Sequence, residues 1–223
     1  MLDALEFDIQ AGEITGLVGV NGAGKTTLIK CLLDLRPVSA GRIEIFGVPH
    51  AEPGARADLA YLPERFTAPY FATGAGFLDF LHRMYGVSPA PDALADALAA
   101  VDLDPAALRM PVRALSKGMG QKLGLVGCLS SGRGLWLLDE PFSGLDPLAR
   151  GLFRRHLQGL RGSGRTVIFT SHALADIEAV CDRLAVLHAG RLVFCGTPAE
   201  FRARFPAAHV EDSYLACIGR LPP

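Results

Sequence analysis

Nine consecutive residues near the start of the chain have the types and spacing needed to grip a phosphate group. They are Gly19, Val20, Asn21, Gly22, Ala23, Gly24, Lys25, Thr26 and Thr27, and they fit the pattern GxxxxGK[ST]. Glycines let the backbone curl so that several N–H groups point at one anion, and a helix starting near Lys25 adds its positive end. Lys25 can reach the β- and γ-phosphates of a nucleotide, and the Thr26 hydroxyl can ligate Mg²⁺. The alternative, a chance glycine turn, is disfavoured by the strand and helix predicted around it.

Two adjacent carboxylates follow an apolar run later in the chain. Residues 135–138 read LWLL, and Asp139 and Glu140 come next. The end of a strand would present both side chains at the carboxyl edge of a sheet, beside the phosphate loop. Asp139 suits an outer-shell Mg²⁺ ligand, and Glu140 can polarise an attacking water as a general base. An ordinary strand followed by an acidic turn is the alternative, and the phosphate loop counts against it.

The elements that must position these groups alternate between strand and helix in the first and last thirds of the chain. Helices are predicted over residues 25–35 and 173–181, and strands over residues 14–18, 42–46, 59–62, 135–138, 166–170, 183–187 and 191–195. Such alternation favours a mostly parallel sheet with helices on both faces. Residues 67–130 are rich in Ala and Leu, and Leu94, Leu98 and Val101 lie at helical spacing, which predicts a helical insert.

Composition limits the classes of partner and compartment. The 223 residues include 22 basic and 23 acidic side chains, a net charge of −1 that gives no sign of a nucleic-acid partner. A membrane-spanning helix needs about 20 mostly apolar residues, and the longest uncharged stretch, 66–78, contains Pro69 and two glycines. The first ten residues lack the basic region of a secretion signal. The five scattered cysteines predict reduced cytosolic thiols.

Four further segments resemble motifs of the ATP-binding-cassette (ABC) proteins. Residues 115–121, LSKGMGQ, resemble the LSGGQ signature of that family, and residues 143–146, SGLD, resemble its D-loop. Residues 170–172, TSH, are similar to the switch-histidine motif, and residues 61–64, YLPE, stand where the family has its Q-loop. The motifs occur in the family's order along nearly the whole chain, and the LSKGM and YLPE variants are similar to those of bacterial and archaeal exporter-type cassettes.

The resemblance implies an architecture. It is the α/β fold of phosphate-loop (P-loop) NTPases, RecA-like, with a mostly parallel sheet core and a helical subdomain insert. A single ABC ATPase domain would cover residues 1–223. Residues 1–66 and 131–223 would form its catalytic core, and residues 67–130 the helical subdomain that carries the signature motif. ATP and Mg²⁺ would be the cofactors, and the protein would be cytoplasmic and peripheral on the inner face of the cell membrane.

The resemblance also implies roles and partners. In the family two cassettes pack head to tail, and each ATP lies between the phosphate loop of one and the signature of the other. Ser116 and Gly118 would therefore contact the γ-phosphate held by a second ABC ATPase subunit, in a homodimer or a heterodimer. His172 would contact the γ-phosphate of its own cassette beside the catalytic Glu140, and Asp146 would couple the two sites. The motion would pass to a transmembrane permease subunit.

The Q-loop departs from the family's pattern. Glu64 stands where the family has glutamine. An ionised glutamate only accepts hydrogen bonds, so Glu64 cannot donate to the γ-phosphate or to an attacking water. Its carboxylate can still lie near Mg²⁺, and we keep Glu64 as a nucleotide-sensing and metal-site residue.

The start of the chain departs further. The family stacks an aromatic residue on adenine well before the phosphate loop, whereas Phe7 is the only aromatic residue before Gly19. The pattern places Phe7 in a strand that leads into residues 14–18, so the stacking residue is missing. Its loss would cost about 1–3 kcal/mol of binding free energy. Two explanations stay open: a start codon assigned too late, or a cassette that binds ATP weakly or relies on its partner.

Five aromatic side chains follow the Q-loop, and the sequence favours neither of two interpretations of them. They are either a docking surface for a helix of the transmembrane subunit or the core of the helical insert. The residues are Phe66, Tyr70, Phe71, Phe77 and Phe80.

Three other functions compete with transport. A non-transport ABC ATPase of the translation or repair type usually carries two cassettes or long coiled-coil inserts. A phosphate-loop GTPase needs a guanine-reading NKxD segment, which the sequence lacks. A weakly binding, non-hydrolysing regulatory cassette conflicts with the intact Lys25, Asp139, Glu140 and His172.

Overall fold

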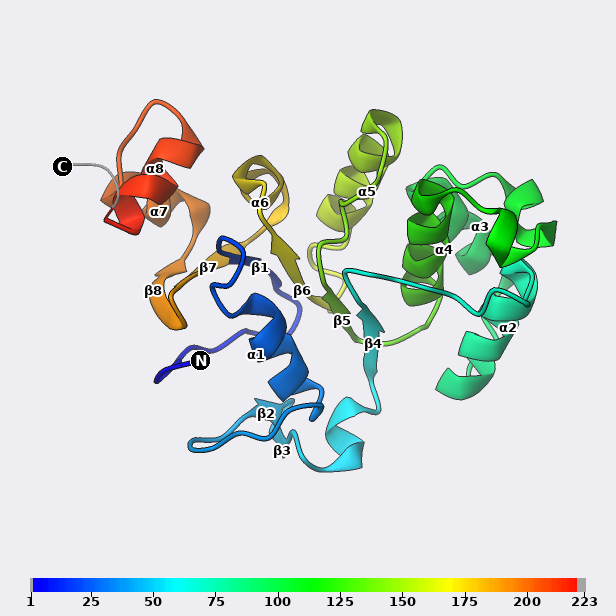
Figure 1. Cartoon of the computed structure of the whole chain (residues 1–223), viewed down its shortest axis with the longest axis horizontal. Helices are drawn as coiled ribbons and strands as arrows, with labels where there is room; N and C mark the ends of the chain where they lie inside the picture. The colour runs from blue at the N-terminus through cyan, green and yellow to red at the C-terminus, as the bar shows by residue number, and fades with distance from the viewer. Residues whose placement is uncertain (1, 220–223) are drawn as a thin grey trace.

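The computed structural model describes residues 2–219 as a sheet with helices on both faces (Figure 1). The main sheet consists of β1 (Ile14–Val18), β4 (Leu59–Leu62), β5 (Leu135–Leu138), β6 (Thr166–Ser171), β7 (Arg183–His188) and β8 (Arg191–Gly196). A separate hairpin consists of β2 (Glu44–Ile45) and β3 (Val48–Pro49). The helices are α1 (Lys25–Leu32), α2 (Gly74–Tyr85), α3 (Pro91–Ala100), α4 (Lys117–Leu129), α5 (Pro147–Gly159), α6 (Leu174–Val180), α7 (Pro198–Arg204) and α8 (Val210–Cys217).

The order of the strands brings four carboxyl ends together. The order is β4-β5-β6-β1-β7-β8, with β8 antiparallel to β7 and every other pair parallel. Leu62 at the end of β4 pairs with Leu138 at the end of β5, and Val18 of β1 pairs with Ser171 of β6. The loops that leave β4, β5, β6 and β1 therefore start side by side at one edge of the sheet.

The sheet is buried on both faces, which explains the apolar runs in its strands. In β5, Trp136 and Leu138 pack into the largest hydrophobic cluster, whereas Leu137 packs on the opposite face with Ile29 of α1. Figure 1 shows α1 and the β2–β3 hairpin on one side of the strands and α5 and α6 on the other. The predicted mostly parallel α/β fold is confirmed.

Residues 67–130 contain no strand of either sheet, and α2, α3 and α4 gather at one end of the molecule (Figure 1). Thr73 caps α2 by accepting a hydrogen bond from the Gly76 N–H, and Gly86 ends it at a φ of 66°. Pro91 opens α3, where the missing proline N–H costs no hydrogen bond. Ser116 caps α4 in the same way as Thr73 caps α2. Local signals thus account for the start of each helix.

Three predicted elements differ from the structure by more than one residue at an end. The first helix ends at Leu32 rather than at residue 35. The strand predicted over 42–46 is reduced to Glu44–Ile45, because Phe46 adopts a φ of 50° and turns the chain into β3. The strand predicted around Phe7 is absent: residues 2–13 are irregular, and Phe7 packs with Leu2 and Leu5 against a small cluster beneath β1 and β7.

The five aromatic residues after the Q-loop divide between the two interpretations. Phe77 is buried and meets the ring of Phe66 at a centroid distance of 5.3 Å, so these two belong to the core. Tyr70, Phe71 and Phe80 are exposed, with Phe71 exposed by 81%. The exposed members therefore remain available as a surface for a partner.

The described residues bear on two expectations from composition. Within residues 2–219, no helix has the length and apolar character needed to cross a bilayer. All five cysteines are free thiols, and Cys31, Cys128 and Cys181 are buried.

The contact between β1 and α6 gives a test of the fold. A Cβ added to Gly16 would lie 2.5 Å from Ile177 Cδ1 and 2.7 Å from Cys181 Sγ. Overpacking of this kind should make Gly16→Ala lower the free energy of unfolding by about 1–3 kcal/mol in urea titrations. The control is Gly151→Ala in α5, where a Cβ meets nothing within 4 Å, and it should raise that free energy by about 0.5–1 kcal/mol. Equal effects of the two substitutions would contradict this packing.

Candidate functional site

The four neighbouring strand ends surround a cavity of about 680 Å³, within the range of small-molecule sites. One wall is the phosphate loop after β1, and another is Asp139 and Glu140 after β5. Glu64 after β4 and His172 after β6 complete it. The cavity lining comprises Val20, Asn21, Gly22, Gly24, Lys25, Thr26, Thr27, Glu64, Asp139, Glu140, Ser143 and His172.

The phosphate loop has the backbone geometry that its sequence predicts. Gly24 caps α1 at a φ of 114°, a conformation that L side chains rarely adopt, and an added Cβ would also lie 2.6 Å from Leu2 Cδ2. The loop therefore turns directly into the N-terminus of α1, whose free N–H groups face the cavity. The buried Lys25 ammonium donates to the Gly19 carbonyl at 2.5 Å, across the loop it closes. Gly19 and Ala23 belong to this turn but are not among the residues that line the cavity.

Asp139 lies between the phosphate loop and β6. Its Oδ2 is 3.5 Å from the Thr26 hydroxyl, and its Oδ1 accepts a hydrogen bond of 2.6 Å from the buried Thr170 hydroxyl. Burial raises the pKa of the Asp139 carboxyl, the Thr170 hydrogen bond opposes that rise, and the nearby Glu64 charge adds to it. Asp139 is thus a desolvated carboxylate next to the hydroxyl with which it would share a cation.

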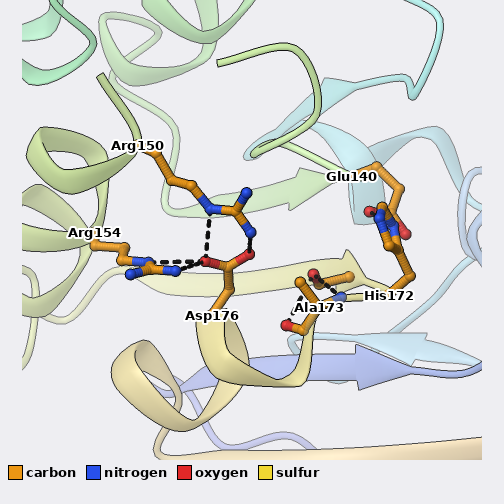
Figure 2. A network of polar contacts seen from close by, with 7 residues as sticks. Glu140, Arg150, Arg154, His172, Ala173 and Asp176 are labelled. Atoms are coloured by element: carbon orange, nitrogen blue, oxygen red, sulfur yellow. Dashed lines mark hydrogen bonds and ion pairs between the residues drawn. The ribbon is translucent and has the colours of Figure 1, made fainter. Parts of the chain in front are cut away.

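Glu140 and His172 both line the cavity, and their side chains are in contact (Figure 2). The His172 Nδ1 lies 2.9 Å from Glu140 Oε2, and the proton belongs to Nδ1 if the carboxylate is ionised. Glu140 has a φ of 52°, and its N–H donates to the Thr170 hydroxyl at 2.7 Å. Thr170 therefore holds the Asp139 carboxylate and the Glu140 backbone from the neighbouring strand.

The oxygen donors in the cavity fit Mg²⁺. Thr26, Asp139 and Glu64 offer a hydroxyl and two carboxylates, and Mg²⁺ binds oxygen ligands, usually with substrate phosphates and water completing its shell. Within residues 2–219, no group of three His, Cys, Asp or Glu side chains forms a metal cage. Such a site is suited to a cation that arrives with phosphates.

Ser116, Gly118 and Asp146 are not among the residues that line this cavity. Ser116 accepts a hydrogen bond from the Met119 N–H at 3.2 Å, and a Cβ on Gly118 would lie 3.0 Å from the Gly144 carbonyl oxygen. The signature and the D-loop of one chain therefore touch each other rather than the phosphate loop of that chain.

Asp146 anchors the start of α5. Its carboxylate accepts a hydrogen bond from the Ala149 N–H at 2.9 Å and lies 2.8 Å from the Lys122 ammonium of α4. The backbone hydrogen bond and then the Lys122 contact lower the pKa of Asp146 to about 2. The side chain is thereby tied to the signature helix of its own chain.

A tyrosine that the sequence analysis did not select supports the phosphate loop. The Val20 N–H donates to the Tyr214 hydroxyl of α8 at 3.1 Å, across 194 residues of sequence. Tyr214 is buried beneath the loop. A lone tyrosine in a C-terminal helix has no local pattern that marks it, so only the folded chain reveals this contact. Thr170, by contrast, stands inside the TSH motif and was detectable as a polar residue in an apolar strand.

The cavity lining contributed by residues 2–219 includes no Phe, Tyr or Trp side chain. Phe7 belongs instead to the cluster formed by Leu17, Ala23 and their neighbours. The lining thus offers polar and backbone groups to a triphosphate, and no Phe, Tyr or Trp ring for adenine to stack on.

The strand order, the phosphate loop and the acidic pair together define a P-loop nucleotide-binding domain of mostly parallel α/β type. Residues 2–143 match the profile of the family described as ABC transporter. The chain belongs to the ABC transporter family.

Individual relatives give the extent of the similarity. An uncharacterized ABC transporter ATP-binding protein of Synechocystis sp. is 38% identical over 203 residues, which cover 89% of this chain and 57% of the relative. Nod factor export ATP-binding protein I of Burkholderia lata is 38% identical over 205 residues, covering 89% and 66% of the two chains. A solved structure described as the ATP binding subunit of an ABC transporter superposes with a TM-score of 0.89 at 31% identity, covering 97% and 92%.

The chain spans 57% to 66% of the length of the three curated relatives that it matches first.

The contact between α8 and the phosphate loop yields a binding prediction. Tyr214→Phe removes the acceptor of the Val20 N–H, a hydrogen bond worth about 0.5–1.5 kcal/mol. We expect the dissociation constant of ATP, measured by titration calorimetry, to rise roughly 2- to 10-fold. The control is Tyr70→Phe, since Tyr70 is exposed and lies in the helical insert of residues 67–130. Equal affinities of the two variants would refute a supporting role for Tyr214.

The lowered pKa of Asp146 predicts a pH dependence. A depressed carboxyl pKa stabilises the fold above the unfolded-state value of 3.8, and this stabilisation is lost as the pH falls toward about 2. The urea midpoints of the wild type and Asp146→Ala should therefore differ most near neutral pH and converge between those two values. A difference that stays constant down to the acid limit would show that the Asp146 charge contributes nothing.

Proposed function

We propose that this chain binds ATP with Mg²⁺ and hydrolyses it as the ATP-binding subunit of an ABC transporter. This proposal rests on one observation: four side chains at the ends of adjacent strands line the same cavity. They are Lys25, Asp139, Glu140 and His172. A pure binding module needs the phosphate loop alone. Glu140 and His172, in contact at 2.9 Å, add the general base that hydrolysis needs.

Each side chain has a task in this reaction. Lys25 leaves the Gly19 carbonyl and binds the β- and γ-phosphates together with the loop N–H groups. Thr26, Asp139 and Glu64 would hold Mg²⁺, which when bound would neutralise charge on the phosphate oxygens. Glu140 accepts a proton from the attacking water, the His172 Nδ1–H orients that carboxylate, and the imidazole lies next to the γ-phosphate.

The second cassette supplies what one chain lacks. Ser116 and Gly118 stand away from their own cavity, so in a head-to-tail pair they are free to contact the γ-phosphate held by the other copy. Ser116 lies at the N-terminus of α4, where backbone N–H groups favour an anion. Asp146 is joined to the signature helix α4 by its ion pair with Lys122. It therefore links the two nucleotide sites, each of which is formed by both copies.

The helical insert of residues 67–130 offers a surface for the transmembrane partner. Tyr70 and Phe71 meet edge to face at 5.6 Å, and both are exposed, as is Phe80 on α2. These three aromatic residues follow Glu64 in the sequence, and Glu64 lines the nucleotide cavity. We propose that residues 67–130 act as a helical subdomain on the catalytic core of residues 1–66 and 131–223. The exposed Tyr70, Phe71 and Phe80 would dock a permease helix at the cytoplasmic face of the cell membrane.

The test is Glu140→Gln, which keeps the shape of the side chain and removes its basicity. We expect hydrolysis to fall roughly 100-fold or more, because general-base assistance contributes about 10²–10⁴-fold. ATP with Mg²⁺ should then trap a dimer, detected by light scattering coupled to size-exclusion chromatography.

The matched control is Glu44→Gln on the exposed β2–β3 hairpin. It should hydrolyse ATP at the wild-type rate and form no lasting dimer. Retained hydrolysis in Glu140→Gln would remove Glu140 from the mechanism. A wild type that binds ATP without turnover, with its membrane partner present, would favour a regulatory cassette instead.

A further inference from the structure

A buried carboxylate joins the two helices that follow the D-loop and the switch histidine. Asp176 is 0% exposed and lies in the first turn of α6, four residues after His172. Arg150 and Arg154 lie four residues apart on α5, which starts immediately after Asp146. Residues four apart share one face of a helix, so both guanidinium groups point at the same carboxylate.

The contacts are dense for a single side chain (Figure 2). Arg150 donates through Nε to Oδ1 at 3.0 Å and through Nη2 to Oδ2. Arg154 donates through Nε to Oδ1 at 2.8 Å and through Nη2 to the same oxygen. The Arg150 pair is bidentate, a geometry that fixes orientation as well as distance.

Burial makes this junction rigid. A carboxylate removed from water is strongly destabilising unless its partners stay in place, so α5 and α6 cannot separate without exposing or orphaning Asp176. The D-loop end of α5 and the start of α6 must therefore move as one body.

The position of His172 depends on the unit formed by α5 and α6. Its side chain is 70% exposed, and among residues 2–219 its only hydrogen-bond partner is Glu140. The backbone after it is held by a local turn, in which Ser171 Oγ accepts from the Ala173 N–H at 3.0 Å. The turn leads directly into α6, so the placement of α6 sets the placement of the imidazole.

A second cavity, of about 220 Å³, lies between the cluster and the catalytic pair. Its lining includes Arg150 and Asp176 together with Glu140 and His172. The cluster thus forms a wall of the space that borders the Glu140–His172 contact.

We propose that Asp176 is a positioning residue that holds His172 against Glu140 and joins both to the Asp146 end of α5. A displacement of the D-loop by a second copy would reach His172 through Arg150 and Asp176. The inference rests on the proposed function, and it adds an intrachain connection between the surface offered to the other copy and the hydrolytic pair.

The same helix carries a built-in control. Glu178, two residues after Asp176, also binds an arginine through two nitrogens, but that arginine is Arg202 of α7. Glu178→Gln therefore breaks an ion pair of α6 that faces away from the D-loop.

The experiment measures steady-state ATP hydrolysis by the full chain with its membrane partner. Asp176→Asn should lower kcat roughly 10- to 100-fold, since a misplaced catalytic group costs about that much. The KM for ATP should stay within about twofold, because the phosphate-loop contacts are untouched. Glu178→Gln should leave kcat within about twofold of the wild type.

A double variant and a spectroscopic measurement distinguish a role of Asp176 in positioning His172 from a role in the stability of the fold. Asp176→Asn combined with Arg154→Gln keeps the net charge of the cluster at its wild-type value and should show the same loss of kcat. The ¹³C-histidine spectrum of the nucleotide-free chain, with His172 assigned from His172→Gln, should show a shifted His172 ring signal in both variants. Glu178→Gln should leave that signal in place.

The outcomes distinguish the two proposals. A wild type that hydrolyses no ATP overturns the proposed function and this inference with it. If the wild type hydrolyses ATP, the inference alone is overturned by an unchanged kcat or an unmoved His172 signal in a folded Asp176 variant. Failure of both Asp176 variants to fold would also overturn it, since Asp176 would then serve folding.

Discussion

Four adjacent strands that run in the same direction must end at the same edge of their sheet, and the candidate site depends on this constraint. Residues far apart in sequence meet there without any direct pairing between their loops. The phosphate loop leaves β1, Glu64 follows β4, Asp139 follows β5 and His172 follows β6. The strands in turn stay parallel and in register because both faces of the sheet are buried, one under α1 and the other under α5 and α6.

Within that frame, a few buried polar contacts set the fine geometry. The Thr170 hydroxyl donates to Asp139 and accepts from the Glu140 backbone, so one side chain fixes a carboxylate and the backbone of the next residue. Glu140 has a left-handed backbone conformation, which turns its side chain away from that of Asp139 and toward His172. Buried polar atoms of this kind are destabilising when unpaired, so each contact also resists distortion of the others.

Sequence reasoning succeeded where the signal is local. The apolar runs of β4 and β5 predicted both strands with their observed ends, and the glycines and Lys25 predicted a turn that enters a helix. It failed at Phe7 and Phe46, where a hydrophobic residue serves a cluster or a turn rather than a strand. Tyr214 and Asp176 could not be found this way, because their partners lie 194 and 26 residues away and no period marks such distances. The Glu64 variant was visible in the sequence, and the structure places it in the cavity.

Gly118 lies against the Gly144 carbonyl of the D-loop. The signature of a chain is therefore separate from the nucleotide pocket of that chain. In a head-to-tail pair, a side chain introduced at Gly118 would spoil the pocket completed on the other copy, while a change at Lys25 would spoil the chain's own pocket. A mixed pair with one lesion on each chain would concentrate both defects in one composite pocket and leave the other whole. Two inactive alleles of such a protein can therefore complement each other, so the inheritance of defects would reveal how the pockets are shared.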